Sequence, residues 1–250
     1  MIIGISGKIG SGKDTIAKMI KFITLINFNE FNKLRTEHNE KIDLFQFYID
    51  RADEIVKGSN WEIKRYADKV KDVICILIGC TREQLEDQKF KNKKLGKEWT
   101  INGYILTPRD LLQLVGTDCG RNVIHPDIWV NATMKDYLIR TFCKDCDHLI
   151  KSIYDIKECC EDKIDYPNWI IPDVRFINEA KAIEERGFVI RVNRNFHLDN
   201  LKINKHESET NLDNYKFKYV IENTTMDQLF NDVLIILKKQ KLCHDLQYMS

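Results

Sequence analysis

A short glycine-rich segment near the start of the chain has the residue types and the spacing of a phosphate-binding loop. Gly7 is followed, after four residues, by Gly12 and Lys13 in the sequence Gly-Lys-Ile-Gly-Ser-Gly-Lys-Asp-Thr. Glycines let successive backbone N–H groups turn inward around a phosphate, and the N-terminus of a following helix adds partial positive charge. A lysine at the end of such a loop reaches the outer phosphates as a point charge. We therefore expect residues 7–15 to bind a nucleoside triphosphate.

One position in this loop departs from the usual motif. Asp14 stands where the motif has serine or threonine, so a carboxylate, acting through water, becomes the expected ligand of the metal. Thr15 remains available for the α-phosphate. The expected cofactors are ATP and Mg²⁺, and the expected ATP-binding residues are Gly7, Gly10, Ser11, Gly12, Lys13, Asp14 and Thr15.

The segments around the loop alternate between strand and helix patterns. Apolar runs predict strands at 1–5, 61–67, 169–172, 188–192 and 219–222. Helical spacing predicts helices at 15–26, 68–79, 107–116, 178–186 and after Thr225. This alternation predicts an α/β fold with a mostly parallel β-sheet covered by helices on both faces. We expect one domain over residues 1–250, with insertions at 27–60 and 140–168.

In a parallel sheet the ligand lies at the carboxyl ends of the strands. Asp173 and Arg175 follow one predicted strand, and Arg194 follows the next, so both should lie near the glycine-rich loop. Arg175 is either a clamp on the transferred phosphate or an ion-pair partner of Asp173. Asp173 either positions Mg²⁺ through water or orients Arg175.

Several motifs stand in an order that is similar to one family. They are Gly7 to Thr15, Tyr66-Ala67-Asp68-Lys69-Val70-Lys71, Thr107-Pro108-Arg109-Asp110-Leu111-Leu112-Gln113, Gly116-Thr117-Asp118-Cys119-Gly120-Arg121, Pro126-Asp127-Ile128-Trp129 and Asp173-Val174-Arg175-Phe176-Ile177-Asn178-Glu179. With this set the chain resembles the deoxynucleoside monophosphate kinases of large DNA phages and viruses. The likeness covers most of residues 1–237, and it is weak over 27–60 and 140–168.

The resemblance implies the P-loop kinase fold, with a core, a monophosphate-binding region and a lid near 194–212. The implied reaction moves the γ-phosphoryl group of ATP to a (deoxy)nucleoside 5′-monophosphate and gives the diphosphate. Lys13, Arg175 and Arg194 become the expected catalytic cations, with Arg194 similar to a lid cation. The expected partner is the monophosphate substrate.

Four residues are candidates for binding that substrate. Arg109 and Gln113 lie one helical turn apart, so an arginine that grips a phosphate and a glutamine that reads a base share one face. The alternative is the surface of an ordinary amphipathic helix. Arg121 is a similar candidate. Lys71 either touches the monophosphate or is a solvated helix lysine.

The bulk composition excludes several classes of partner. The 39 basic and 38 acidic residues give a net charge of +1, so no nucleic-acid or membrane partner is expected. No apolar run approaches the ~20 residues of a membrane span, and no signal-peptide layout precedes the first strand. The eight cysteines are then expected to be reduced thiols in a cytoplasmic protein, in the host cytoplasm if the source is viral. Whether the protein forms a homodimer is left open by the sequence.

For two further features of the sequence, the interpretation without a functional site is favoured. Cys143, Cys146, His148, Cys159 and Cys160 lack the regular spacing of zinc ligands, which favours free thiols. The lysine-rich segment 87–106 is expected to be a solvated loop, with a lid or polyanion contact as the alternative.

Two rival functions remain. A kinase of a hydroxyl-bearing metabolite or nucleoside would need a carboxylate base, for which Asp68 or Asp118 could serve. A non-metabolic P-loop ATPase would instead hydrolyse ATP without a small acceptor.

Overall fold

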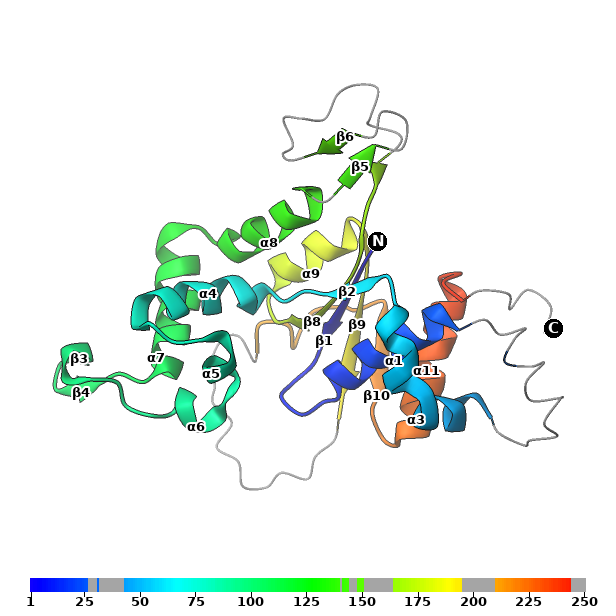
Figure 1. The fold of residues 1–250 in the computed structure, drawn as a ribbon, viewed down its shortest axis with the longest axis horizontal. Helices are drawn as coiled ribbons and strands as arrows, with labels where there is room; N and C mark the ends of the chain where they lie inside the picture. The colour runs from blue at the N-terminus through cyan, green and yellow to red at the C-terminus, as the bar shows by residue number, and fades with distance from the viewer. Residues whose placement is uncertain are drawn as a thin grey trace. The chain divides into compact units, whose positions relative to one another are not determined.

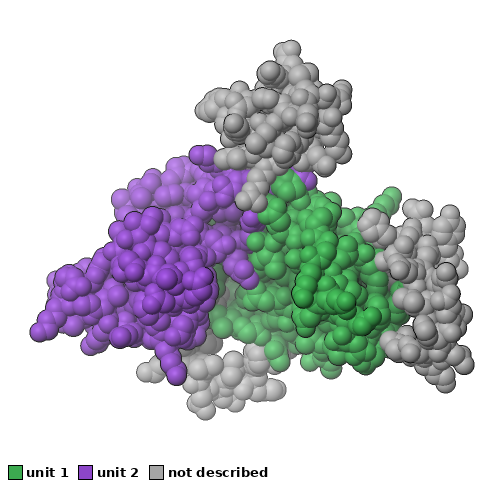
Figure 2. Space-filling view, viewed as in Figure 1, with its two compact units in different colours: residues 1–63, 167–250 green, residues 64–166 purple. Residues whose placement is uncertain are grey.

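The computed structural model describes residues 1–26, 31, 43–139, 141–143, 148–150, 164–194 and 210–243. The chain forms two compact units, which Figure 2 shows in green and purple. Unit 1 consists of Met1–Ile63 and Pro167–Ser250, and unit 2 consists of Lys64–Tyr166. Unit 2 is therefore a continuous stretch of sequence between the two parts of unit 1.

Unit 1 is built on a five-stranded sheet with the strand order β10-β9-β1-β8-β2. The strands are β1 (Ile2–Ser6), β2 (Trp61–Ile63), β8 (Asn168–Val174), β9 (Gly187–Asn193) and β10 (Tyr219–Glu222). Every neighbouring pair in this sheet is parallel. The predicted α/β fold with a mostly parallel sheet is therefore confirmed.

Helices cover both faces of this sheet (Figure 1). On one face lie α1 (Lys13–Leu25), α3 (Leu44–Ile55), the short 3-10 turn η1 (Val56–Gly58) and α11 (Met226–Lys239). On the other face lies α9 (Ile177–Glu184). The strands can be buried on both sides because helices cover them on both sides, and β1 is buried along its whole length.

The core of unit 1 lies between β1 and the helices α1, α3 and α11. The four residues predicted for one face of α1, Ile16, Met19, Ile20 and Ile23, are all fully buried, as expected. The aromatic rings of α1, α3 and α11 pack together, with 6.2 Å between the centroids of Phe22 and Phe230. Each fully buried side chain of this size contributes about 1.5–3 kcal/mol relative to exposure.

Three details of unit 1 differ from the sequence prediction. The second strand ends at Ile63 instead of residue 67, because a helix of unit 2 already begins at Tyr66. Met226 is 47 % exposed and does not face the core. Gly187 is the first residue of β9 and does not cap the preceding helix.

The reason for a glycine at position 187 is a close approach of two strands. A Cβ at this position would lie 1.8 Å from the carbonyl oxygen of Ile2 on β1. Only a residue without a side chain fits against the backbone of the central strand there.

Unit 2 is mainly helical. Its larger elements are α4 (Tyr66–Ile78), α5 (Arg82–Glu86), α6 (Gln88–Lys91), α7 (Pro108–Gln113), the π-helix η3 (Leu114–Ile124) and α8 (Ile128–Ile139). Its smaller elements are η2 (Lys97–Trp99) and the strands β3 (Thr100–Ile101), β4 (Tyr104–Ile105), β5 (Thr141–Cys143), β6 (His148–Ile150) and β7 (Ile164–Asp165). The predicted loop at 87–106 is therefore wrong in detail, because it contains α6 and the β3–β4 hairpin.

Two helix predictions in unit 2 also need correction. The helix that begins after Thr107 does not end at Gly116 but continues as a π-helix to Ile124. The apolar face of α4 is narrower than predicted, since Val70 and Ile74 are buried whereas Val73 and Leu77 are largely exposed. Ile74 packs with Leu85, Leu106 and Leu111 in a second apolar cluster.

Some predictions fall on residues that the structure does not describe. Within the predicted insertion at 27–60, these residues are 27–30 and 32–42. They also include residues 195–209 of the predicted lid and the side chains of the cysteine-rich stretch 143–160. Within the described ranges, no helix is long and apolar enough to cross a membrane.

Candidate phosphate site

The loop between β1 and α1 depends on its glycines. Gly10 and Gly12 have φ angles of 76° and 98°, in the left-handed region that other residues avoid. A Cβ at Gly7 would lie 2.4 Å from the hydroxyl oxygen of Ser11. The loop therefore turns tightly at the carboxyl end of β1 and leads directly into α1, which begins at Lys13.

Ser11 contains a buried hydroxyl group that lacks a partner. The residue is 3 % exposed, and its Oγ has no hydrogen-bond partner among the described residues. Leaving such a group unpaired costs about 1–3 kcal/mol, which a bound acceptor removes. A buried hydroxyl inside a glycine-rich loop fits an oxygen-rich ligand such as a phosphate.

The side chain of Lys13 reaches back over the loop. Its Nζ donates hydrogen bonds to the carbonyl oxygens of Gly7, at 2.7 Å, and Lys8, at 2.8 Å. The ammonium group is thus held beside the loop. In the same first turn of α1, Asp14 is exposed and Thr15 is half-buried.

Arg175 follows β8 and lies near the loop, as the parallel sheet requires. Together with Gly7 and Lys8 it lines a small open pocket. The backbone at Arg175 is fixed by Glu179, which is 2 % exposed and accepts hydrogen bonds from the backbone N–H groups of Arg175 (2.7 Å) and Phe176 (3.1 Å). Asp173 is half-buried near the end of the same strand.

The ends of β9 and β10 also meet the loop. Arg194 follows β9, and its Nη1 donates to the carbonyl oxygen of Gly10 at 3.3 Å. Asn223 follows β10, and its Nδ2 donates to the carbonyl oxygen of Ser11 at 2.8 Å. Asn223 was not predicted as a site residue, although its position directly after a predicted strand is a usable signal.

Arg191 was also missed. This residue of β9 lines the same pocket as Arg175, and its side chain is 13 % exposed. Its guanidinium group donates to the hydroxyl of Ser6 at 3.1 Å and to the carboxylate of Asp213 at 3.4 Å. A charged residue inside a buried apolar strand needs such partners. An arginine within the apolar run 188–192 was therefore the sequence signal for a buried polar site.

The predicted acceptor residues all belong to unit 2. Arg109 donates from Nε to Asn92 (2.9 Å) and from Nη2 to Gln88 (2.7 Å). The Nη1 of Arg121 donates to the carbonyl oxygen of Pro126 at 3.4 Å. Gln113 is half-buried at the last residue of α7.

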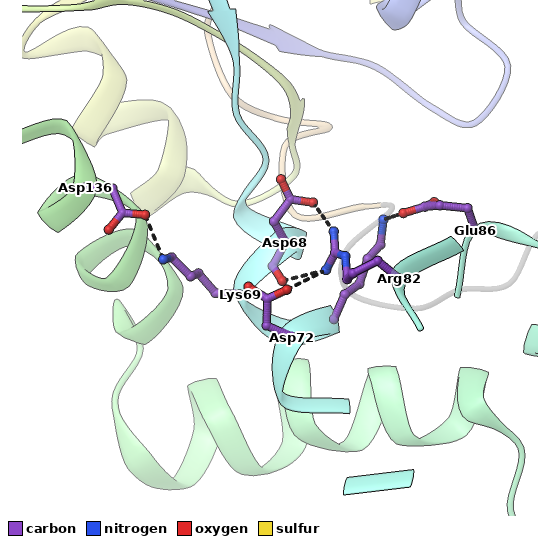
Figure 3. Close-up of polar contacts among 7 residues, drawn as sticks. Asp68, Lys69, Asp72, Arg82, Glu86 and Asp136 are labelled. Carbon is purple, nitrogen blue, oxygen red and sulfur yellow. Dashed lines mark hydrogen bonds and ion pairs between the residues drawn. The ribbon is translucent and has the colours of Figure 1, made fainter. Parts of the chain in front are cut away.

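Lys71 is not the solvated helix lysine of the alternative interpretation. Its side chain is 13 % exposed, and its Nζ lies 2.5 Å from a carboxylate oxygen of Glu86 (Figure 3). Burial raises the pKa of Glu86, but the hydrogen bond and charge of Lys71 outweigh this effect, so that the pKa is lowered.

Further ion pairs fix α4 in unit 2 (Figure 3). Arg82 binds the carboxylates of Asp68, at 2.6 Å, and Asp72, at 3.2 Å. Lys69 binds Asp136 of α8 at 2.7 Å. The Asp68 carboxylate, one of the two candidate bases of a hydroxyl kinase, is therefore already engaged by a guanidinium group, whereas the other candidate, Asp118, is exposed.

The N-terminus of α7, which carries Arg109, is held by Asp110. One carboxylate oxygen of Asp110 accepts hydrogen bonds from the backbone N–H (2.8 Å) and hydroxyl (2.7 Å) of Thr107 and from the hydroxyl of Tyr104 (3.1 Å). Burial raises the pKa of Asp110, but these hydrogen bonds outweigh it and hold the pKa below its usual value of 3.8.

The charge of Asp110 should therefore contribute a pH-dependent part of the stability. Because the folded pKa is lowered, this contribution is present above pH ~4 and is lost as the pH falls through the folded value. We expect Asp110→Asn to lower the melting temperature at pH 7, and the gap to wild type to shrink toward pH 3. Thermal unfolding across this range measures it, with the exposed Asp118→Asn as control. A gap that does not change with pH would contradict the assignment.

Comparison with known proteins agrees with this description. No family model matches the chain. Over 208 aligned residues the chain is 24 % identical to the deoxynucleoside-5′-monophosphate kinase of Escherichia phage T5. The aligned residues cover 74 % of this chain and 72 % of that enzyme. The chain is thus similar in sequence to a nucleotide kinase, and its parallel sheet between helices is an α/β fold consistent with a P-loop kinase.

Proposed function

We propose that the protein transfers the γ-phosphoryl group of ATP to a (deoxy)nucleoside 5′-monophosphate. The observation that carries this proposal is the glycine-rich loop at the end of β1, where the buried Ser11 hydroxyl has no hydrogen-bond partner among the described residues and the Lys13 ammonium lies beside it. The class of acceptor is supported by the similarity to the phage T5 enzyme and by the cations of unit 2.

In this proposal the loop and the strand ends bind the donor. Gly7, Gly10, Ser11, Gly12, Lys13, Asp14 and Thr15 bind ATP. Lys13, Arg175 and Arg194 are the catalytic cations, because the charge of a transferred phosphoryl group spreads over several oxygens. Arg191 lines the same pocket as Arg175 and adds a positive charge there. Asp14 and Asp173 are the residues that would hold Mg²⁺, which when bound would neutralise part of the phosphate charge.

The acceptor binds to unit 2 through Lys71, Arg109, Gln113 and Arg121. A monophosphate oxygen is already anionic, so the reaction requires alignment and charge neutralisation but no general base. The engagement of Asp68 by Arg82 agrees with such a mechanism.

The test compares matched acceptors in the presence of ATP and Mg²⁺. We expect dTMP to be converted to its diphosphate and thymidine to be ignored, because a neutral nucleoside has no anionic phosphate for the cations of unit 2 to bind. High-performance liquid chromatography of the products measures both reactions.

The other outcomes separate the rival functions. Comparable turnover of thymidine would indicate a hydroxyl kinase, and ATP hydrolysis that needs no acceptor would indicate an ATPase. A second pair, dGMP and GMP, tests the preference for a deoxyribose alone.

A further inference from the structure

Within the described residues, few carboxylates pair with three of the cations of unit 2. Lys71 lies on α4, Lys91 at the end of α6 and Arg109 on α7. The side chains of Lys71 and Lys91 are each only 13 % exposed. Within the described part of the chain, the carboxylate within ion-pair distance of both lysines is that of Glu86, 2.5 Å from Lys71 and 4.0 Å from Lys91.

Arg109 does not relieve this excess of positive charge. Its hydrogen-bond partners Asn92 and Gln88 are neutral amides of α6 and the residue after it. Burial is the main cause that lowers the pKa of Lys91; the charges of Lys71 and Arg109 lower it further, whereas the charges of Glu86 and Asp87 oppose this effect.

The neighbouring carboxylates have other partners. Asp87 caps α6 by accepting hydrogen bonds from the backbone N–H groups of Lys89 and Phe90. Asp68 and Asp72 neutralise Arg82. Within the described residues, Glu86 is therefore the carboxylate that forms ion pairs with both Lys71 and Lys91.

Glu86 differs from the lysines in its exposure. Its side chain is 57 % exposed, and it belongs to the short helix α5. Because the carboxylate side of these ion pairs is exposed, Glu86 can turn back into water when a stronger anion takes its place beside the lysines. A phosphate monoester carries up to two charges and can bind arginine through two oxygens, which makes it such an anion.

We propose that Lys91 joins Lys71 and Arg109 in binding the acceptor phosphate, and that Glu86 is an internal competitor that occupies these cations until the phosphate arrives. The inference rests on the proposed function, since it refines the acceptor site. Helix α6 then has two tasks: it contributes Lys91, and its Gln88 orients the guanidinium group of Arg109.

The experiment measures the binding of dTMP and dGMP by isothermal titration calorimetry without ATP, followed by steady-state kinetics. We expect Lys91→Met to raise Kd and KM for the monophosphate by about 10-fold or more, since charge-assisted hydrogen bonds to phosphate are among the stronger ones. KM for ATP should stay unchanged. Lys94→Met, which removes an exposed lysine three positions away, should leave all constants unchanged.

Glu86→Gln provides the opposite test. Removing the competing charge while keeping the shape should tighten monophosphate binding by roughly 3- to 10-fold. If Glu86 is only a structural anchor, the substitution will instead lower the melting temperature and leave binding unchanged or weaker.

The outcomes distinguish the inference from the proposed function. If the wild-type protein phosphorylates dTMP or dGMP and Lys91→Met binds them normally, the inference is wrong and the function stands. If the wild type neither binds nor phosphorylates any monophosphate, both are wrong.

Discussion

Replacing Lys13 by alanine should lower kcat by about 100-fold or more while the fold stays intact. The lysine ammonium lies beside the loop. In the proposed reaction, negative charge grows on the outer phosphates at this place in the transition state, and removal of one such preorganised donor typically costs about 100- to 1,000-fold. Single-turnover kinetics with ATP and the best monophosphate measures the loss, and circular dichroism checks the fold.

Lys18→Ala is the matched control for this prediction. Lys18 lies on the same helix, but it forms an ion pair with Asp53, whose side chain is 95 % exposed. We expect its turnover to equal that of the wild type. Near-normal turnover of the Lys13 variant would contradict the phosphate-site assignment.

Replacing Gly187 by alanine should have the largest effect on stability. The new methyl group would lie 1.8 Å from the Ile2 carbonyl oxygen and 2.8 Å from its carbonyl carbon, both backbone atoms of the central strand that cannot rotate away. The β1–β9 pair would have to separate at this end. We expect a loss of about 3 kcal/mol or more in the free energy of unfolding, measured by urea denaturation.

Gly58→Ala controls for the loss of glycine itself. A Cβ at Gly58 would meet only a side-chain carbon of Leu25, at an ordinary contact distance of 3.7 Å. Its effect should stay within about 1 kcal/mol of zero. If both variants unfolded at the same urea concentration, the close approach at Gly187 would not contribute to the loss in the free energy of unfolding.

The sheet and the glycine-rich loop could be predicted from the sequence because the patterns that mark them are local. Short apolar runs followed by glycine or charged residues marked the strands, and the spacing of Gly7, Gly12 and Lys13 marked the turn into α1. Parallel strands then bring Arg175 and Arg194 to the edge that holds the loop, whatever the intervening residues are.

The missed features depend on contacts between distant residues. Gly187 has the appearance of a helix terminator, and only its pairing with Ile2 shows why glycine is required. The ion pair of Lys71 spans 15 positions, so the sequence of α4 alone left open whether this lysine binds substrate or is solvated. The π-helical continuation after Gln113 has no recognised local signal; we have no physical account of its length.

The strand order also has a consequence for the synthesis of the protein on the ribosome. The two neighbours of β1 are β8 and β9, and Ile2 pairs with Trp169 and Gly187. At 5–20 residues per second, the apolar strand β1 waits roughly 10–40 s for either partner. Unit 2 is a continuous segment that is complete before β8 emerges. The nascent chain can therefore fold its middle first, while β1 stays without its neighbouring strands until the last third of the chain is made.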